Sequence, residues 1–94
     1  MTHPVIPNVL TIAGTDPSGG AGVQADLKTF SAQGAYGMSV TTALVAQTTT
    51  GVAEIHEIPP EFVTRQLVTL LDDVRVDAVK IGMLSNADVI RAVV

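Results

Sequence analysis

The stretch AGTDPSGGAG, residues 13–22, limits what this 94-residue chain can fold into more than any other part of its sequence. It carries four glycines in ten residues and directly follows the apolar run Val9–Ala13. A short apolar run that ends in glycine and turn residues is typical of a buried β-strand. From Ala21 to Gly34 the apolar residues recur with the spacing of a helix, at Val23, Leu27 and Phe30. The sequence therefore predicts a strand, a glycine-rich loop and a helix, in that order.

The remaining elements alternate in a similar way. Met38–Ala46 is apolar and rich in β-branched residues, which favours a strand covered on both faces. After a loop at 48–51, Val52–Ile58 is expected to form a short edge strand, and Pro59-Pro60 predicts the start of a second helix. The predicted apolar stripe of this second helix consists of Val63, Leu67, Leu70, Leu71 and Val74. Ala78–Gly82 is expected to be a third buried strand, and a capping box at 85–88 predicts a third helix.

This order of elements predicts an α/β fold with a parallel sheet and right-handed crossovers. Three or four strands are few for a parallel sheet, so we expect one edge of this sheet to need a neighbour. The expectation is that residues 1–94 form the N-terminal part of a single larger domain.

The composition argues against several classes of partner. Five basic and nine acidic residues give a net charge of −4, and one Tyr, two Phe and no Trp offer few stacking platforms, so nucleic acid is not expected. With no cysteine, the chain has no disulfide, zinc knuckle or cysteine nucleophile. His3 and His56 are isolated, so no metal site is expected. No signal sequence and no apolar run of about 20 residues is found, which predicts a cytoplasmic protein without a membrane span.

Two familiar phosphate-binding motifs fail on the glycine stretch. Gly14–Gly19 matches the first half of a P-loop, but Gly20-Ala21 stands where the lysine and the hydroxyl residue are needed. Residues 20–25 satisfy G-x-G-x-x-A, yet the second strand ends at Ala46-Gln47-Thr48, without the acidic residue that holds a dinucleotide's ribose. A dehydrogenase-like domain is therefore a distant alternative.

The position of the loop predicts a different ligand. Ligands of open parallel sheets bind outside the carboxyl ends of the strands, which here are 14–16, 45–47 and 82–84. These segments offer close backbone approach, the amide of Gln47 and the flexible side chain of Met83, a set that suits a small, flat, neutral heterocycle. Asp26, at the boundary of the first helix's apolar face, could accept a hydrogen bond from a ligand hydroxyl or amino group.

Structural interpretations of the same residues stay open at this stage. Asp16 before Pro17 is also typical of a turn, and Asp26 could be a solvated carboxylate in the first turns of a helix. Gln47 could cap a strand end, and a methionine such as Met83 is often core filler. Lys80 lies inside an apolar strand and needs either a partner carboxylate or a route to solvent, so we assign it no role.

Three segments in order and spacing, AGTDPSGGAGVQADLKTFSAQGAYG, TTALVAQTTTGV and DAVKIGMLS, resemble the hydroxymethylpyrimidine/phosphomethylpyrimidine kinases of the ribokinase-like superfamily. The resemblance runs from about Leu10 to the C-terminus and covers about the first third of that family's domain. It implies a three-layer α/β/α fold, incomplete in this chain. It also implies phosphorylation of 4-amino-5-hydroxymethyl-2-methylpyrimidine and then of its monophosphate, with ATP and Mg²⁺, in thiamine biosynthesis.

The resemblance assigns roles to individual residues. It implies that Gln47 binds the pyrimidine nitrogens, that Val45 and Met83 pack on the ring, and that Gly14 and Asp26 lie near the reacting hydroxymethyl end. The anion hole, the residue that activates the hydroxyl and most of the ATP and Mg²⁺ site lie downstream in this family. We therefore expect no catalytic residue in the chain and no activity from it alone. A non-catalytic binding module of the same ancestry is the alternative, and homodimerisation is left open.

Overall fold

A computed structural model describes residues 6–82, 84, 88 and 90–91 of the chain. The elements along the chain are β1 (Asn8–Ala13), α1 (Gly22–Ala32), β2 (Tyr36–Thr41), β3 (Ala43–Thr48), β4 (Gly51–Glu57), α2 (Pro60–Leu71) and β5 (Ala78–Ile81). The first helix stops before Gly34, which has a φ of +81°, and the second begins at Pro60. Both boundaries follow the predictions from the sequence.

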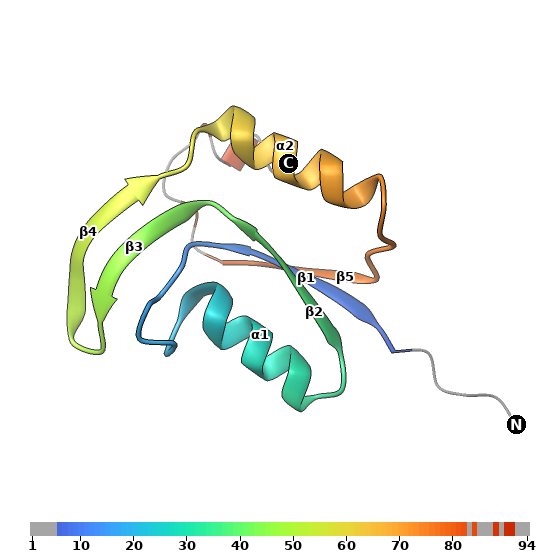
Figure 1. Cartoon of the computed structure of the whole chain (residues 1–94), viewed down its shortest axis with the longest axis horizontal. Helices are drawn as coiled ribbons and strands as arrows, with labels where there is room; N and C mark the ends of the chain where they lie inside the picture. The colour runs from blue at the N-terminus through green and yellow to red at the C-terminus, as the bar shows by residue number, and fades with distance from the viewer. Residues whose placement is uncertain (1–5, 83, 85–87, 89, 92–94) are drawn as a thin grey trace, which may run out of the picture.

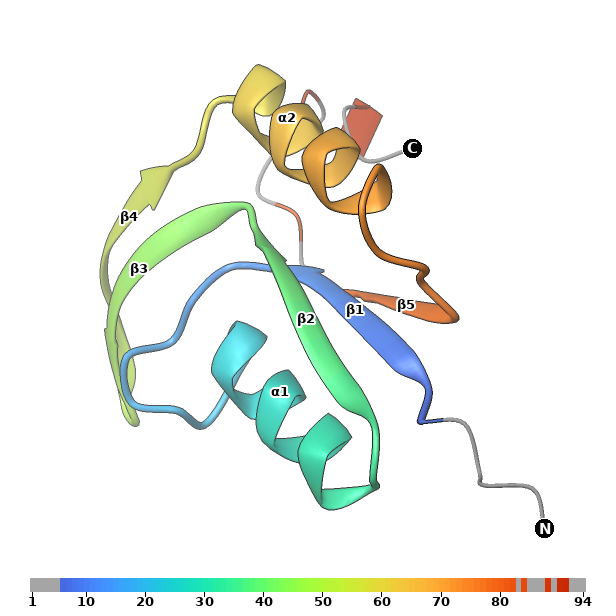
Figure 2. The ribbon, with the colours of Figure 1, turned by 45° about the vertical axis from the view of Figure 1, so that its right-hand side comes forward.

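Three strands form a parallel sheet in the order β2-β1-β5. Helix α1 lies on one face of this sheet and α2 on the other, as Figures 1 and 2 show. The connection from β1 to β2 and the connection from β2 to β5 run in opposite directions across the sheet. Crossovers of one hand that run in opposite directions place their helices on opposite faces, which explains the layering. The predicted three-layer α/β/α arrangement is confirmed.

The apolar core lies between β1, β2 and α2. Its fully buried members are Leu10, Ile12, Val40 and Val63. Leu67 and Leu70 of α2 pack against this cluster, as the predicted stripe requires, whereas Leu71 at the end of the helix is exposed. Leu71 was therefore wrongly included in the stripe. Val63, Leu67 and Leu70 follow i, i+4, i+7 and cover one line of the helix, and Leu71 lies to its side.

The predicted continuous strand at 38–46 is wrong, because the chain leaves the parallel sheet at Thr42. The backbone N–H of Thr42 donates to the Ala13 carbonyl (3.0 Å), and its own carbonyl accepts from the N–H of Ile58 (3.1 Å). After this residue, β3 pairs with β4 in an antiparallel hairpin that curves away from the sheet (Figure 1). The predicted strand at 52–58 therefore exists, but it pairs with β3 and not at the edge of the parallel sheet.

The burial expected for Ala78–Gly82 is also wrong in this chain. All four residues of β5 are exposed. Among the described residues, β5 pairs only with β1, so its other edge carries no strand. The prediction of a third helix rests on residues 85–88, of which 85–87 lie outside the described part of the chain.

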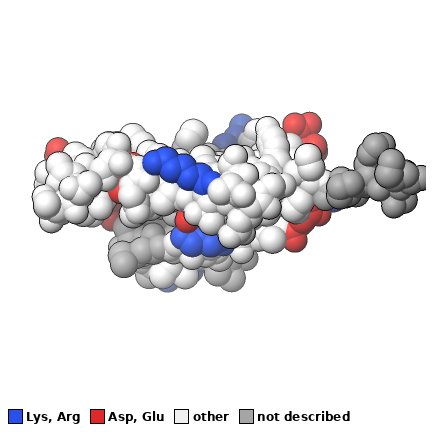
Figure 3. Space-filling model, turned by 90° about the horizontal axis from the view of Figure 1, so that it is seen from below, with Lys and Arg blue, Asp and Glu red and all other residues white. Residues whose placement is uncertain are grey.

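Charged side chains are sparse on the surface seen in Figure 3, and its basic side chains form no continuous stripe over the described residues. The expectation that this chain does not bind nucleic acid stays a prediction. No helix in the described part of the chain is long and apolar enough to cross a membrane.

Candidate functional site

A pocket of about 360 Å³ lies at the carboxyl ends of β1 and β5, between the glycine loop and the β3–β4 hairpin. Its lining comes from the end of β1 and the loop after it, the start of α1, the chain at Thr42-Ala43, the hairpin and β5. The lining residues are Ala13, Gly14, Thr15, Ala21, Gly22, Thr42, Ala43, Val45, Gln47, Val52, Ile55, Lys80 and Gly82. The structure thus brings Gly14, Val45 and Gln47 together, as the sequence predicts.

The glycine loop is organised by Asp16, which is buried. One carboxylate oxygen accepts hydrogen bonds from the N–H (2.9 Å) and the hydroxyl (2.7 Å) of Ser18, and the other accepts from the N–H of Gly20 (3.1 Å). The Ser18 hydroxyl and the backbone N–H groups of Ser18, Ala21 and Gly20 hold the pKa of Asp16 below its ordinary value, against the opposing effect of burial. Asp16 therefore has the structural role of a turn residue.

The loop meets α1 through a close backbone contact at Gly22. This residue has a φ of +62°, and a Cβ atom there would lie 2.4 Å from the Gly14 carbonyl oxygen. The N–H of Val23 donates to that same oxygen over 2.9 Å. Only glycine fits this position, since any side chain would collide with backbone atoms.

The hairpin is joined to the loop by Thr15. Its backbone N–H donates to the Ala43 carbonyl (3.0 Å), and its hydroxyl oxygen accepts from the N–H of Val45 (2.9 Å). These two bonds hold Val45 over the loop. A Cβ atom added to Gly14 would be in van der Waals contact with a Val45 methyl group. This role of Thr15 is not predictable from the sequence, because nothing near it in the sequence indicates a partner thirty residues away.

Asp26 and Lys80 form an ion pair beside the pocket. The Lys80 ammonium lies 3.0 Å from both carboxylate oxygens of Asp26, and the Thr11 hydroxyl donates to one of them over 2.6 Å. The Asp26 side chain is 15% exposed and that of Lys80 is 49% exposed, and Lys80 is the member of the pair that lines the pocket. The partner carboxylate expected for Lys80 is confirmed. Both oxygens of Asp26 already accept hydrogen bonds, and any contact of Asp26 with a ligand stays a prediction.

The prediction for Met83 falls on a residue outside the described part of the chain. Its neighbour Gly82 lines the pocket. Among the described residues, no group of three or more His, Asp or Glu side chains is arranged to hold a metal ion.

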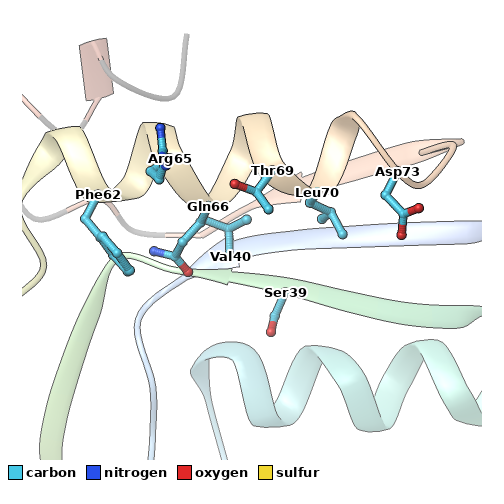
Figure 4. A pocket seen from close by; sticks show the side chains of 8 residues that line it. All are labelled: Ser39, Val40, Phe62, Arg65, Gln66, Thr69, Leu70 and Asp73. Carbon is cyan, nitrogen blue, oxygen red and sulfur yellow. The ribbon is translucent and has the colours of Figure 1, made fainter.

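A second hollow, of about 520 Å³, lies between α2 and β2 (Figure 4). Gln66 is its central polar residue, and its amide is already bonded to both the N–H and the carbonyl of Thr41 (3.1 and 2.9 Å). Arg65 and Asp73 stand apart along the helix (Figure 4). Of the predicted site residues, those that the structure describes do not contribute to this hollow, and its polar groups do not converge on one point.

The first pocket therefore combines apolar walls with an amide and an ammonium group. Val45, Val52 and Ile55 supply the apolar surface, Gln47 supplies both donors and an acceptor, and Lys80 supplies a positive charge. A pocket at the carboxyl ends of parallel strands is the place where open α/β sheets usually bind small molecules, and it defines this chain as a segment of an α/β protein. Comparison with known proteins then specifies the family. Residues 16–94 match the family model for phosphomethylpyrimidine kinase, and the chain belongs to that family.

Two curated relatives illustrate the similarity. The hydroxymethylpyrimidine/phosphomethylpyrimidine kinase of Salmonella typhimurium is 65% identical over 86 residues, which are 92% of this chain and 32% of that protein. A multifunctional thiamine biosynthesis protein of Corynebacterium efficiens is 62% identical over 87 residues, 93% of this chain and 12% of that protein. The chain thus spans about a third of the Salmonella enzyme and a smaller share of the multifunctional one.

Solved structures show the same fold. The phosphomethylpyrimidine kinase of Clostridium difficile superposes with a TM-score of 0.88 at 49% identity, over 93% of this chain and 38% of that one. The pyridoxal kinase of Staphylococcus aureus in complex with AMP-PCP and pyridoxal superposes with a TM-score of 0.84 at 41% identity, over 96% of this chain and 34% of that one. The fold is therefore ribokinase-like, and this chain holds part of it.

Proposed function

We propose that this chain is the substrate-binding front part of a kinase that phosphorylates 4-amino-5-hydroxymethyl-2-methylpyrimidine and its monophosphate in thiamine biosynthesis. The observation that carries the proposal is the pocket that joins Gly14, Val45 and Gln47 in a chain 65% identical to a kinase of that name. Residues 1–94 are proposed to be the N-terminal part of one such domain, acting in the cytoplasm.

In this proposal Gln47 forms hydrogen bonds with the polar edge of the ring. A pyrimidine presents ring nitrogens as acceptors and an amino group as a donor, and one carboxamide can donate to a ring nitrogen and accept from the amino group. Val45, held over the loop by Thr15, packs on the ring, and Met83 is proposed to do the same. Gly14 leaves room for the hydroxymethyl end, beside the Asp26–Lys80 pair.

The glycine loop does not fit the polyphosphate of ATP. The N–H groups of Ser18 and Gly20 already donate to the Asp16 side chain, and that of Gly19 donates to the Asp16 carbonyl (2.9 Å). A phosphate-binding loop needs such N–H groups free, and in this loop they already donate to Asp16. We therefore propose that ATP and Mg²⁺ bind mainly to the part of the longer relatives that this chain does not span, and that the chain alone does not transfer a phosphoryl group.

The test is a titration of the chain with hydroxymethylpyrimidine, followed by amide NMR. NAD and pyridoxal serve as parallel ligands, the latter because pyridoxal kinases share the fold. We expect saturable shifts with the pyrimidine and about tenfold weaker binding by Gln47→Ala, which leaves the ring's polar edge unpaired. Gln33→Ala is the matched control, because Gln33 is an exposed glutamine that does not line the pocket.

Four outcomes would count against the proposal. A folded chain that does not bind the pyrimidine contradicts the pocket assignment. Binding of NAD would favour the dinucleotide alternative. Phosphorylation of the pyrimidine by the chain alone would show that ATP also binds here. If the natural, longer protein binds the pyrimidine but never phosphorylates it, a non-catalytic binding module is the better description.

A further inference from the structure

The β3–β4 hairpin contains an irregularity beside the pocket. Its ladder is regular from Ala43 opposite Glu57 to Ala46 opposite Glu54. The next pair joins Gln47 to Val52, so that Ala53 is an extra residue with no partner of its own. This arrangement is a β-bulge, which locally changes the direction in which side chains point.

The bulge decides which residue stands next to Gln47. In a regular strand side chains alternate, so Ile55 would share a face with Ala53, and Val52 would point to the other side. Because the bulge adds one residue between them, the side chain of Val52 lies on the same face of the hairpin as that of Ile55. The pocket lining agrees independently, since it includes Val52 and Ile55 but not Ala53.

The opposite face of the hairpin supports the same assignment. A separate hollow on that side is lined by Leu44, Ala46, Glu54 and His56 of the hairpin and by Pro17 of the loop, and it shares only Thr15 and Val45 with the site pocket. The hairpin therefore presents one apolar face to the site and a different face away from it. On the site face, Val52 is 54% exposed and Ile55 is 53% exposed, so both offer apolar surface that a ligand can cover.

We propose that Val52 is a specificity-determining residue that packs against the methyl group at position 2 of the pyrimidine. This inference rests on the proposed function and on the role given there to Gln47. In a 2-methylpyrimidine the methyl carbon lies between the two ring nitrogens. A side chain that binds either of these nitrogens therefore has the methyl group beside it, and Val52 is the cross-strand neighbour of Gln47.

The experiment compares two ligands that differ only in this methyl group. They are 4-amino-5-hydroxymethyl-2-methylpyrimidine and 4-amino-5-hydroxymethylpyrimidine, titrated into the natural full-length protein by calorimetry. We expect the wild type to favour the methylated ligand about tenfold, the usual value of one methyl group in an apolar pocket. Val52→Ala is expected to reduce that preference to about twofold, because most of the apolar surface around the methyl group is lost.

Leu44→Ala is the matched control, because Leu44 is an equally exposed apolar residue on the other face of the same hairpin. The Leu44→Ala variant should prefer the methylated ligand over the unmethylated one as strongly as the wild type does. Val52→Thr, which keeps the shape of the side chain, gives a second reading if the alanine variant does not fold, and it should also lower the preference. Equal weakening of both ligands by Val52→Ala, or an unchanged preference, would overturn the inference.

The same data separate this inference from the proposed function. A wild-type protein that binds neither pyrimidine contradicts the function itself. A wild-type protein that binds both, with a methyl preference that Val52→Ala leaves intact, contradicts only the role of Val52.

Discussion

The parallel sheet and the β3–β4 hairpin are supported in opposite ways. Strand β1 is buried over most of its length and has a neighbour on each side, whereas every residue of β4 is exposed. A two-stranded hairpin without a core is marginal by itself, so this one depends on its bonds to the loop and to Thr42. Yet both regions supply walls of the same pocket. The comparison indicates that the sheet provides stability, and in the proposed function the hairpin serves recognition of the ligand.

The largest expected effect in this comparison is at Gly22, where the sheet region meets α1. Gly22→Ala places a Cβ 2.4 Å from the Gly14 carbonyl oxygen at a φ of +62°. We expect it to lower the free energy of unfolding by at least about 2 kcal/mol, through backbone strain and the collision. Urea unfolding measures the change. Gly51→Ala in the hairpin is the control, because an added Cβ there meets nothing within 4 Å, and an equal loss at both glycines would contradict the division of roles.

A pair of valines sharpens the comparison further. Val63 is fully buried in the core, and Val52 projects from the hairpin. Val63→Ala is expected to cost about 2 kcal/mol in the free energy of unfolding, because the cavity it leaves cannot fully collapse. Val52→Ala should cost less than about 0.5 kcal/mol, as is usual for exposed positions. Thermal and urea unfolding of both variants would show whether the hairpin contributes more stability than its exposure indicates.

The smallest expected effect is a pH dependence from the loop between the two regions. The folded chain holds the pKa of Asp16 below its ordinary value of 3.8. Its stabilising contribution is therefore complete above about pH 4 and is lost as the pH falls through the lower, folded value. Asp16→Asn should make unfolding less steeply dependent on pH below about pH 4. Urea unfolding at a series of pH values tests this, and an unchanged pH dependence would show that the Ser18 and Gly20 bonds do not persist in solution.

The sequence predicted the elements whose signals are local. The strand before the glycine loop, the stop of α1 near Gly34 and the start of α2 at Pro60 each depend on residues within one turn of the boundary. Gly14, Val45 and Gln47 were also predicted together, since ligand sites at strand ends follow from the order of the elements.

The sequence could not predict features that depend on distant partners. Thr42 breaks the strand through bonds to Ala13 and Ile58, and no glycine or proline marks the break. The inward position of Val52 depends on the bulge, which a count of alternating residues misses. The apolar composition of β5 indicates a buried strand, but β5 is exposed, because among the described residues it pairs only with β1 and composition does not say which neighbours a strand has.

The strand order has a consequence for synthesis on the ribosome. Strand β1 is made first, its partner β2 ends at Thr41, and its other partner, β5, does not begin until Ala78. While the nascent chain grows, β1, α1 and β2 can assemble from contacts close in sequence, but one side of β1 has no hydrogen-bonding partner until β5 emerges. An apolar strand with an open edge is prone to pair with other chains. The interval between Thr41 and Ala78 is therefore a stage of synthesis at which the central strand β1 is open to pairing with other chains.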